Sequence, residues 1–177
     1  MTYNHKKASE EKYLIALNGE LLQLPVEQIS HLIKKKMQGD RAVQKLFEKF
    51  EVSLEQLENL RIEIKDLEGR YAETDLESMV LDKNLFSDGK FWENNWFVCV
   101  HELVHWLTRF KEDEAYFQDP EECLGFVGSI ATELARGIDI DEIWTKIFPR
   151  IEFHFHQESD AKEFFLNCIQ KAKELLG

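Results

Sequence analysis

"VCVHELVHWLTRF", residues 98–110, is an apolar stretch with a few polar residues set into it. From residue 96 to residue 107 the only polar side chains are His101, Glu102 and His105. A helix that is apolar almost all round is typical of a protein interior. Burying an imidazole or a carboxylate without a partner costs roughly a few kcal/mol. The stretch therefore predicts a buried helix whose three polar residues have a specific partner.

The spacing of the two histidines suits a metal ion. His101 and His105 are four residues apart, so on a helix they share one face, with Cβ atoms about 6 Å apart. Glu102 lies beside that face, where it would hold a water molecule. This is the H-E-x-x-H pattern of zinc peptidases, in which the imidazoles bind the metal and the glutamate is the general base. Two core histidines held by structural hydrogen bonds remain the alternative interpretation.

A catalytic zinc site needs a third protein ligand and keeps a further position open for water. We expect that ligand from the next helix, DPEECLGFVGSIATELARG, which should begin at Asp119-Pro120 and end near Gly137. Glu122 lies in its first turn and is our preferred ligand. It could instead complete a capping box with Asp119, in which case Glu121 or a histidine would bind the metal.

Two further features of this second helix are predicted. Gly125 and Gly128 would let it approach the 98–110 helix closely. Its core stripe is expected to contain Cys123, Val127, Ile130 and Leu134, with the nearby carboxylate at position 133 as a solvated charge on its flank.

Periodicity elsewhere predicts a single domain over residues 1–177, of the α+β class and mostly helical. We expect short helices over residues 1–60, the first ending near Asn18-Gly19 and the second beginning at Pro25. Alternation then predicts strands at 61–67 and 77–83, paired as an antiparallel hairpin. Helices should follow in the remaining segments, at 90–110, 119–137, 140–147 and 159–176. The pattern at 149–158 fits a strand or a helical turn.

Composition narrows the class of protein. The 177 residues are 44% hydrophobic and carry a formal net charge of −12. An acidic surface is repelled by phosphates, so nucleic acid and anionic membranes are not expected partners. The first 15 residues lack the apolar run of a signal peptide, and Cys99, Cys123 and Cys168 fit reduced, apolar positions. We therefore expect a cytoplasmic protein, and the sequence makes no prediction of its oligomeric state.

The H-E-x-x-H helix followed by a glutamate-bearing helix resembles the gluzincin class of zinc metallopeptidases. Residues 61–137 are similar to small single-domain members from phages and bacteria. The resemblance implies a zincin-like fold, Zn²⁺ held by His101, His105 and Glu122, and Glu102 as catalytic base. It also implies that the edge of the preceding sheet binds an extended peptide by strand addition.

The sequence departs from the larger gluzincins at two places. They carry an aspartate four residues beyond the glutamate ligand, which orients a histidine, and here that residue is Phe126. They also use a downstream tyrosine or histidine to stabilise the oxyanion. Our preferred candidates for that role are His156 and Tyr116, and the other candidates are Tyr71 and His154.

The expected function is hydrolysis of a peptide or protein substrate by a zinc-dependent metallopeptidase in a bacterial or phage-infected cell. Two alternatives stay open. The chain could be a zinc-binding protein-interaction domain that does not cut its partner. It could also be a metal-free helical interaction protein in which the H-E-x-x-H pattern is coincidental.

Overall fold

The computed structural model of the chain describes residues 11–110 and 120–177, and for residues 120–122 it describes the backbone only. The strands are β1 (Lys12–Leu17), β2 (Glu20–Pro25), β3 (Arg61–Lys65), β4 (Ala72–Thr74) and β5 (Ser78–Asp82). The α-helices are α1 (Val26–Gly39), α2 (Arg41–Phe50), α3 (Trp96–Thr108), α4 (Pro120–Ala135), α5 (Ile140–Glu152) and α6 (Glu158–Leu176). Short helical segments are η1 (Leu54–Asn59), η2 (Lys83–Phe86) and the π-helical η3 (Phe91–Asn95). The predicted mostly helical α+β class is confirmed.

Strands β1 and β2 form an antiparallel hairpin, where a helix ending near Asn18-Gly19 was predicted. That prediction was wrong. Asn18 and Gly19 have φ angles of 52° and 82°, as in the two-residue turns that favour Asn-Gly and match the twist of paired strands. The helix α1, predicted to follow Pro25, is confirmed, and its buried stripe consists of Ile29, Ile33 and Met37.

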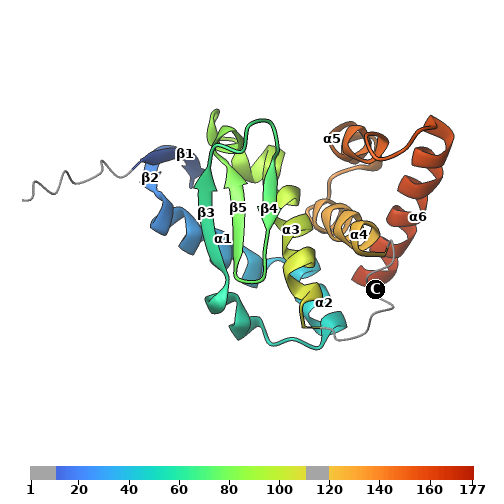
Figure 1. Cartoon of the computed structure of the whole chain (residues 1–177), viewed down its shortest axis with the longest axis horizontal. Helices are drawn as coiled ribbons and strands as arrows, with labels where there is room; N and C mark the ends of the chain where they lie inside the picture. Colours follow the sequence, from blue (N-terminus) through green and yellow to red (C-terminus); the bar gives the residue numbers. More distant parts are fainter. Residues whose placement is uncertain (1–10, 111–119) are drawn as a thin grey trace, which may run out of the picture.

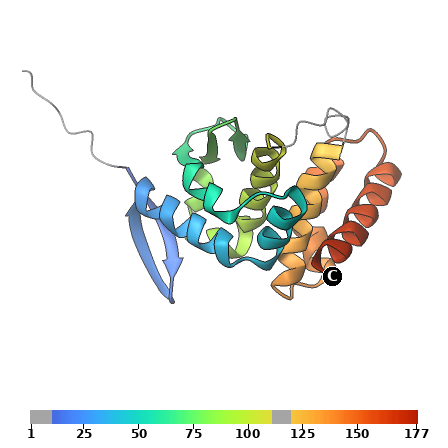
Figure 2. The ribbon, with the colours of Figure 1, turned by 90° about the horizontal axis from the view of Figure 1, so that it is seen from below.

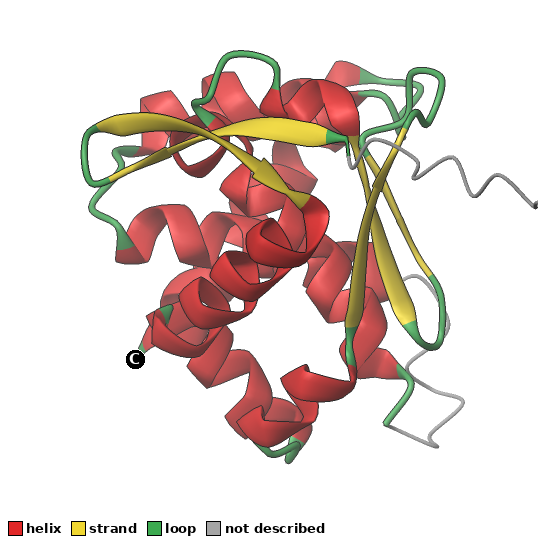
Figure 3. Ribbon diagram, turned by 90° about the vertical axis from the view of Figure 1, so that its left-hand side faces the viewer, coloured by secondary structure: helices red, strands yellow, loops and turns green. Residues whose placement is uncertain are grey.

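The second sheet has the strand order β3-β5-β4. Strands β3 and β5 were predicted as an antiparallel pair, but they pair in parallel, and β4 pairs with β5 in the antiparallel sense. The reason is β4 itself, because this extra three-residue strand reverses the chain before β5 begins. Its sequence, AET, is too short and too polar to show strand periodicity. Figure 3 shows the β1–β2 hairpin and this sheet as separate sheets.

The predicted helix over residues 90–110 consists of the π-helical turn η3 followed by α3. Helix α5 continues to Glu152, past Pro149, so the ambiguous segment after Phe148 begins as helix and not as a strand. The predicted C-terminal helix is confirmed as α6. None of the described helices has the length and apolar character needed to cross a lipid bilayer.

Helix α3 lies at the centre of the packing. Strands β4 and β5 contact one side of it, and α4 packs along another (Figure 1). Helices α5 and α6 cover the outer side of α4, and the β1–β2 hairpin lies at the opposite end of the molecule (Figure 2). The buried apolar side chains form one continuous core that includes residues from both sheets and from all six α-helices. All the apolar residues of α3 are therefore buried against other elements.

Glu133 is fully buried, contrary to the prediction that it is a solvated charge. Its carboxylate lies 2.7 Å from Nη1 of Arg136 and 3.3 Å from Nζ of Lys146. Lys146 belongs to α5, so this ion pair links α4 to α5. A buried carboxylate is tolerated when it is paired in this way. The partner from a distant helix could not be read from the spacing within α4.

Asp40 connects three helices. Its Oδ1 accepts hydrogen bonds from the amides of Ala42 and Val43 and so caps α2. Its Oδ2 accepts a hydrogen bond from Nε1 of Trp96, at 2.9 Å, and another from the hydroxyl of Thr132. Trp96 opens α3 and Thr132 lies on α4. A single carboxylate thus fixes the start of α2 against both of the helices that form the centre of the core.

We expect Asp40→Ala to lower the free energy of unfolding by about 2–4 kcal/mol, because it removes a cap and the two hydrogen bonds that the carboxylate accepts from the buried side chains of Trp96 and Thr132. The matched control is Asp139→Ala, which removes only the cap of α5, a hydrogen bond to the amide of Glu142. Asp139→Ala should lower the free energy of unfolding by about 1 kcal/mol. Urea unfolding of both variants measures the difference. Equal losses would show that the bonds to Trp96 and Thr132 contribute nothing.

Candidate functional site

Every residue of α3 is buried except His101, Glu102 and His105, which are partly exposed. The three polar residues singled out by the sequence are therefore also the three that reach a surface. The imidazole rings of His101 and His105 lie side by side, with centroids 4.8 Å apart and planes inclined by 57°. Their placement on one face of the helix agrees with the four-residue spacing.

Helix α4 approaches α3 closely at Gly125 and Gly128, as predicted. A Cβ atom on Gly125 would lie only 2.7 Å from Cε1 of His101, and a Cβ on Gly128 would lie 3.0 Å from Val104. The ring of Phe126 meets the ring of His101 edge to face, with centroids 4.7 Å apart. An aromatic ring of α4 therefore packs against this imidazole.

Glu102 has a hydrogen-bond partner that the sequence did not indicate. The hydroxyl of Thr74 donates to Oε2 of Glu102 at a distance of 2.6 Å. Thr74 is the last residue of β4, so the sheet edge reaches the polar face of α3. This contact was missed because β4 itself was not predicted. The hydrogen bond fixes one carboxylate oxygen of Glu102 and leaves the other for a second partner.

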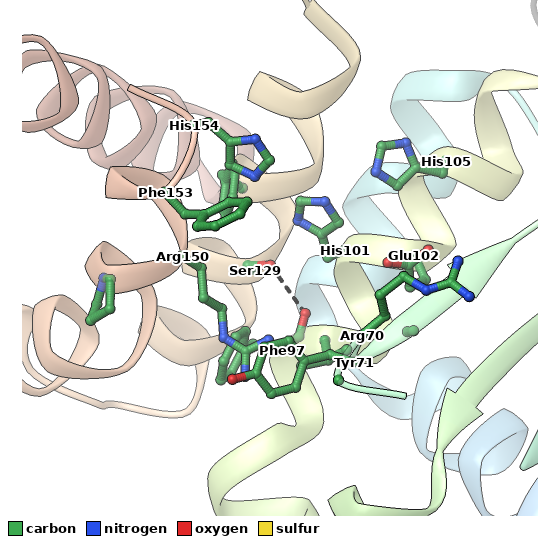
Figure 4. A pocket seen from close by; sticks show the side chains of 15 residues that line it. Arg70, Tyr71, Phe97, His101, Glu102, His105, Ser129, Arg150, Phe153 and His154 are labelled. Carbon is green, nitrogen blue, oxygen red and sulfur yellow. Dashed lines mark hydrogen bonds between the residues drawn. The ribbon is translucent and has the colours of Figure 1, made fainter. Parts of the chain in front are cut away.

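These side chains line a pocket of about 550 Å³ (Figure 4). Four structural regions form its wall: the β3–β4 connection with the start of β4, then α3, α4, and the end of α5 with the residues after it. The lining residues are Gly69, Arg70, Tyr71, Ala72, Phe97, Val98, His101, Glu102, His105, Phe126, Ser129, Pro149, Arg150, Phe153 and His154. At the base of the pocket, the hydroxyl of Ser129 donates to the carbonyl of Phe97 at 3.0 Å and joins α4 to α3.

Of the other residues predicted for the site, some line the pocket, one does not, and some lie outside the described side chains. Glu122 belongs to the first turn of α4, as does Glu121, and their side chains lie outside the described part of the structure, as does all of Tyr116. His156 is exposed and is not among the residues that line the pocket. His154 and Tyr71, the other candidates for oxyanion stabilisation, both line it.

Among the side chains that the structure describes, no group of three or more His, Cys, Asp or Glu residues is arranged to hold a metal ion. Glu121 and Glu122 are not among those side chains. Comparisons of the chain with protein-family models, with curated proteins and with solved structures gave no match. The residues around α3 are therefore the basis for assigning a function.

Gly125→Ala is expected to displace the ring of His101, because the added methyl group would overlap it. We expect a loss of about 1–3 kcal/mol in the free energy of unfolding, as is typical of overpacking. Gly39→Ala is the matched control, because a Cβ at that helical glycine would meet nothing within 4 Å. It should leave stability unchanged or raise it by up to about 1 kcal/mol. Chemical denaturation tests both, and equal stabilities would contradict the close contact.

Proposed function

We propose that this chain is a zinc-dependent metallopeptidase that hydrolyses a peptide bond in a peptide or protein substrate. One observation carries the proposal. On a helix that is otherwise buried, the only side chains that reach a surface are His101, Glu102 and His105, and all three line the same pocket. A coincidental H-E-x-x-H pattern gives no reason for its three polar residues to share one cavity wall, whereas a metal site requires it.

The donor set and its surroundings fit a zinc ion. Two imidazoles stand side by side, and the absence of a Cβ atom at Gly125 makes room for the ring of His101 against the facing helix. Imidazole nitrogen and carboxylate oxygen are common zinc donors. Glu122 precedes Gly125 by three residues and Ser129 by seven, so helical spacing places its position on the pocket-lining face of α4. His101, His105 and Glu122 would therefore hold the metal.

Zinc, when bound, supplies Lewis acidity that lowers the pKa of a coordinated water and polarises the scissile carbonyl. Glu102 accepts the proton of the attacking water through the carboxylate oxygen that Thr74 leaves free. It then passes this proton to the departing amine. The hydrogen bond from Thr74 holds the carboxylate in place during both transfers. Tyr71 and His154, on the pocket wall, are the described side chains available to stabilise the oxyanion.

The edge of the sheet provides a place for the substrate backbone. In the described sheet β4 is an edge strand, it pairs with β5 on one side only, and Ala72 in β4 lines the pocket. An extended peptide added to this edge would run past Glu102 and would satisfy its backbone groups through hydrogen bonds to β4. Under this proposal the sheet edge beside the H-E-x-x-H helix would make the fold zincin-like, and a glutamate ligand from α4 would make the enzyme a gluzincin.

Zinc binding tests the ligand set. Glu122→Gln should lower the affinity for zinc at least tenfold, as His101→Ala and His105→Ala should, because each removes a donor. Glu121→Gln is the matched control and should bind zinc like the wild type. Isothermal titration with zinc, together with metal analysis of the purified proteins, gives the result. If Glu121→Gln loses zinc and Glu122→Gln does not, the neighbouring glutamate is the ligand.

Glu102→Gln should reduce peptide hydrolysis by a factor of about 1,000 or more, because the amide cannot accept a proton, while zinc binding stays close to that of the wild type. Cleavage of a mixed peptide library, followed by mass spectrometry, measures the activity. A wild-type protein that binds zinc but cleaves nothing in the library would favour the alternative, a zinc-binding interaction domain. Full activity of Glu102→Gln would refute the role of this residue.

A further inference from the structure

The pocket differs in charge from the chain as a whole. The full chain has a formal net charge of −12. Among the described side chains that line the pocket, Glu102 is the only carboxylate, and it stands with the two arginines Arg70 and Arg150 and with three histidines. The proposed ligand Glu122 would add a second carboxylate. The two cations come from different elements, since Arg70 lies in the β3–β4 connection and Arg150 on α5. A negatively charged group would therefore find cations in this pocket that the acidic surface does not lead one to expect.

Arg150 is the more unusual of the two cations. Its guanidinium carbon lies 3.8 Å from the ring centroid of Tyr71 and 4.7 Å from that of Phe97. Burial lowers the pKa of Arg150, and the phenol of Tyr71 opposes that effect. Within residues 11–110 and 123–177, its guanidinium makes no hydrogen bond and no ion pair with a carboxylate. Its contacts there are with the faces of aromatic rings.

Ring contacts of this kind use the face of the guanidinium plane. The N–H groups point outward from its edges and are the donors that pair with a carboxylate through two parallel hydrogen bonds. Arg150 is partly exposed, so these donors are open to water or to a ligand in the pocket. Figure 4 shows Arg150 extending from α5 beside Tyr71 and Phe97. A carboxylate on a ligand in the pocket would replace that water and pair with the outward N–H groups.

The position of Arg150 relative to the proposed metal ligands sets where on a substrate it would act. Phe97, against which Arg150 packs, precedes His101 by one helical turn, which is about 5.4 Å along the axis. An extended peptide advances about 3.3 Å per residue. The guanidinium would thus meet a side chain within about two residues of the bond held near His101.

We propose that Arg150 selects the substrate by pairing with a carboxylate, so that the peptides cleaved carry Asp or Glu within about two residues of the scissile bond. This proposal rests on the proposed peptidase function and names the substrate class of that same pocket. A purely structural role, in which Arg150 only fastens the β3–β4 connection to α5, would predict no preference for charge.

Small hydroxamates that chelate zinc allow binding to be measured without turnover. The probes are the α-hydroxamates of N-acetyl-aspartate and N-acetyl-glutamate, in which the side-chain carboxylate stays free. Each is compared with its uncharged asparagine or glutamine counterpart. Isothermal titration uses the zinc-loaded full chain. The wild type should bind at least one acidic probe about tenfold or more tightly than its amide counterpart. Arg150→Gln should remove that preference and change the affinity for the amide probe less than about threefold, within the scatter expected when no contact is lost.

Arg70→Gln is the matched control. Arg70 also lines the pocket, but it is already paired with Glu73, so its loss should leave the acidic preference unchanged. Arg150→Lys keeps the charge but loses the planar pair of donors, and its preference should fall between those of the wild type and Arg150→Gln. In a peptide library cleaved by the wild type, Asp or Glu should be enriched beside the cut, and Arg150→Gln should abolish that enrichment.

Two outcomes separate the proposals. If zinc does not bind, or if no hydroxamate binds in a zinc-dependent way, the peptidase function fails and the role of Arg150 fails with it. If the hydroxamates bind through zinc but acidic and amide probes bind the wild type equally, only the role of Arg150 is overturned. That role is also overturned if Arg150→Gln weakens both kinds of probe equally, because equal weakening is the result of a structural role.

Discussion

The close packing of α3 against α4 is the contact on which the rest of the structure depends. Gly125 and Gly128 bring the two helices together, and even one added methyl group at Gly125 would overlap the ring of His101. Because interiors are packed to near-crystalline density, such a contact fixes side-chain positions as well as backbones. The same approach that completes the core therefore holds the imidazoles of the candidate site in place, and the stability and the chemistry of the protein share one interface.

The helical part of this arrangement was predictable because it is local. Repeats of three and four residues indicated α1, α4 and α6, and the apolar run around the H-E-x-x-H pattern indicated α3. The small residues at positions 125 and 128 indicated which helices meet. The errors came where local signals compete or are short. Asn18-Gly19 can end a helix, but it is a stronger signal for a hairpin turn. The three-residue strand β4 was too short to be recognised, so the pairing of β3 with β5 was predicted in the wrong sense.

In the candidate site, too, the residues on one helix could be predicted and those brought in from other elements could not. His101, Glu102 and His105 could be identified from spacing on one helix. Thr74, Arg150 and the ring of Phe126 could not be placed around them, because they reach the pocket from elements whose relative positions are set by the tertiary fold. The buried pairing of Glu133 was hidden for the same reason, since Lys146 belongs to another helix. Sequence periodicity assigns a residue to a face, and only the packing of distant segments decides what that face meets.

The negative charges on the surface and the arginines of the pocket affect a substrate at different distances. Charges on the surface are screened within about 8 Å at physiological ionic strength, so the net charge affects how a substrate approaches and has little effect once it is bound. Under the proposed function an acidic peptide would be slowed at long range and held at short range, where Arg150 packs against the rings of Tyr71 and Phe97. Under the proposed function, selectivity for a carboxylate would thus arise from slower dissociation of the matching substrate and not from faster capture. Such a division disfavours nonspecific binding of acidic chains while keeping the preference of the pocket itself.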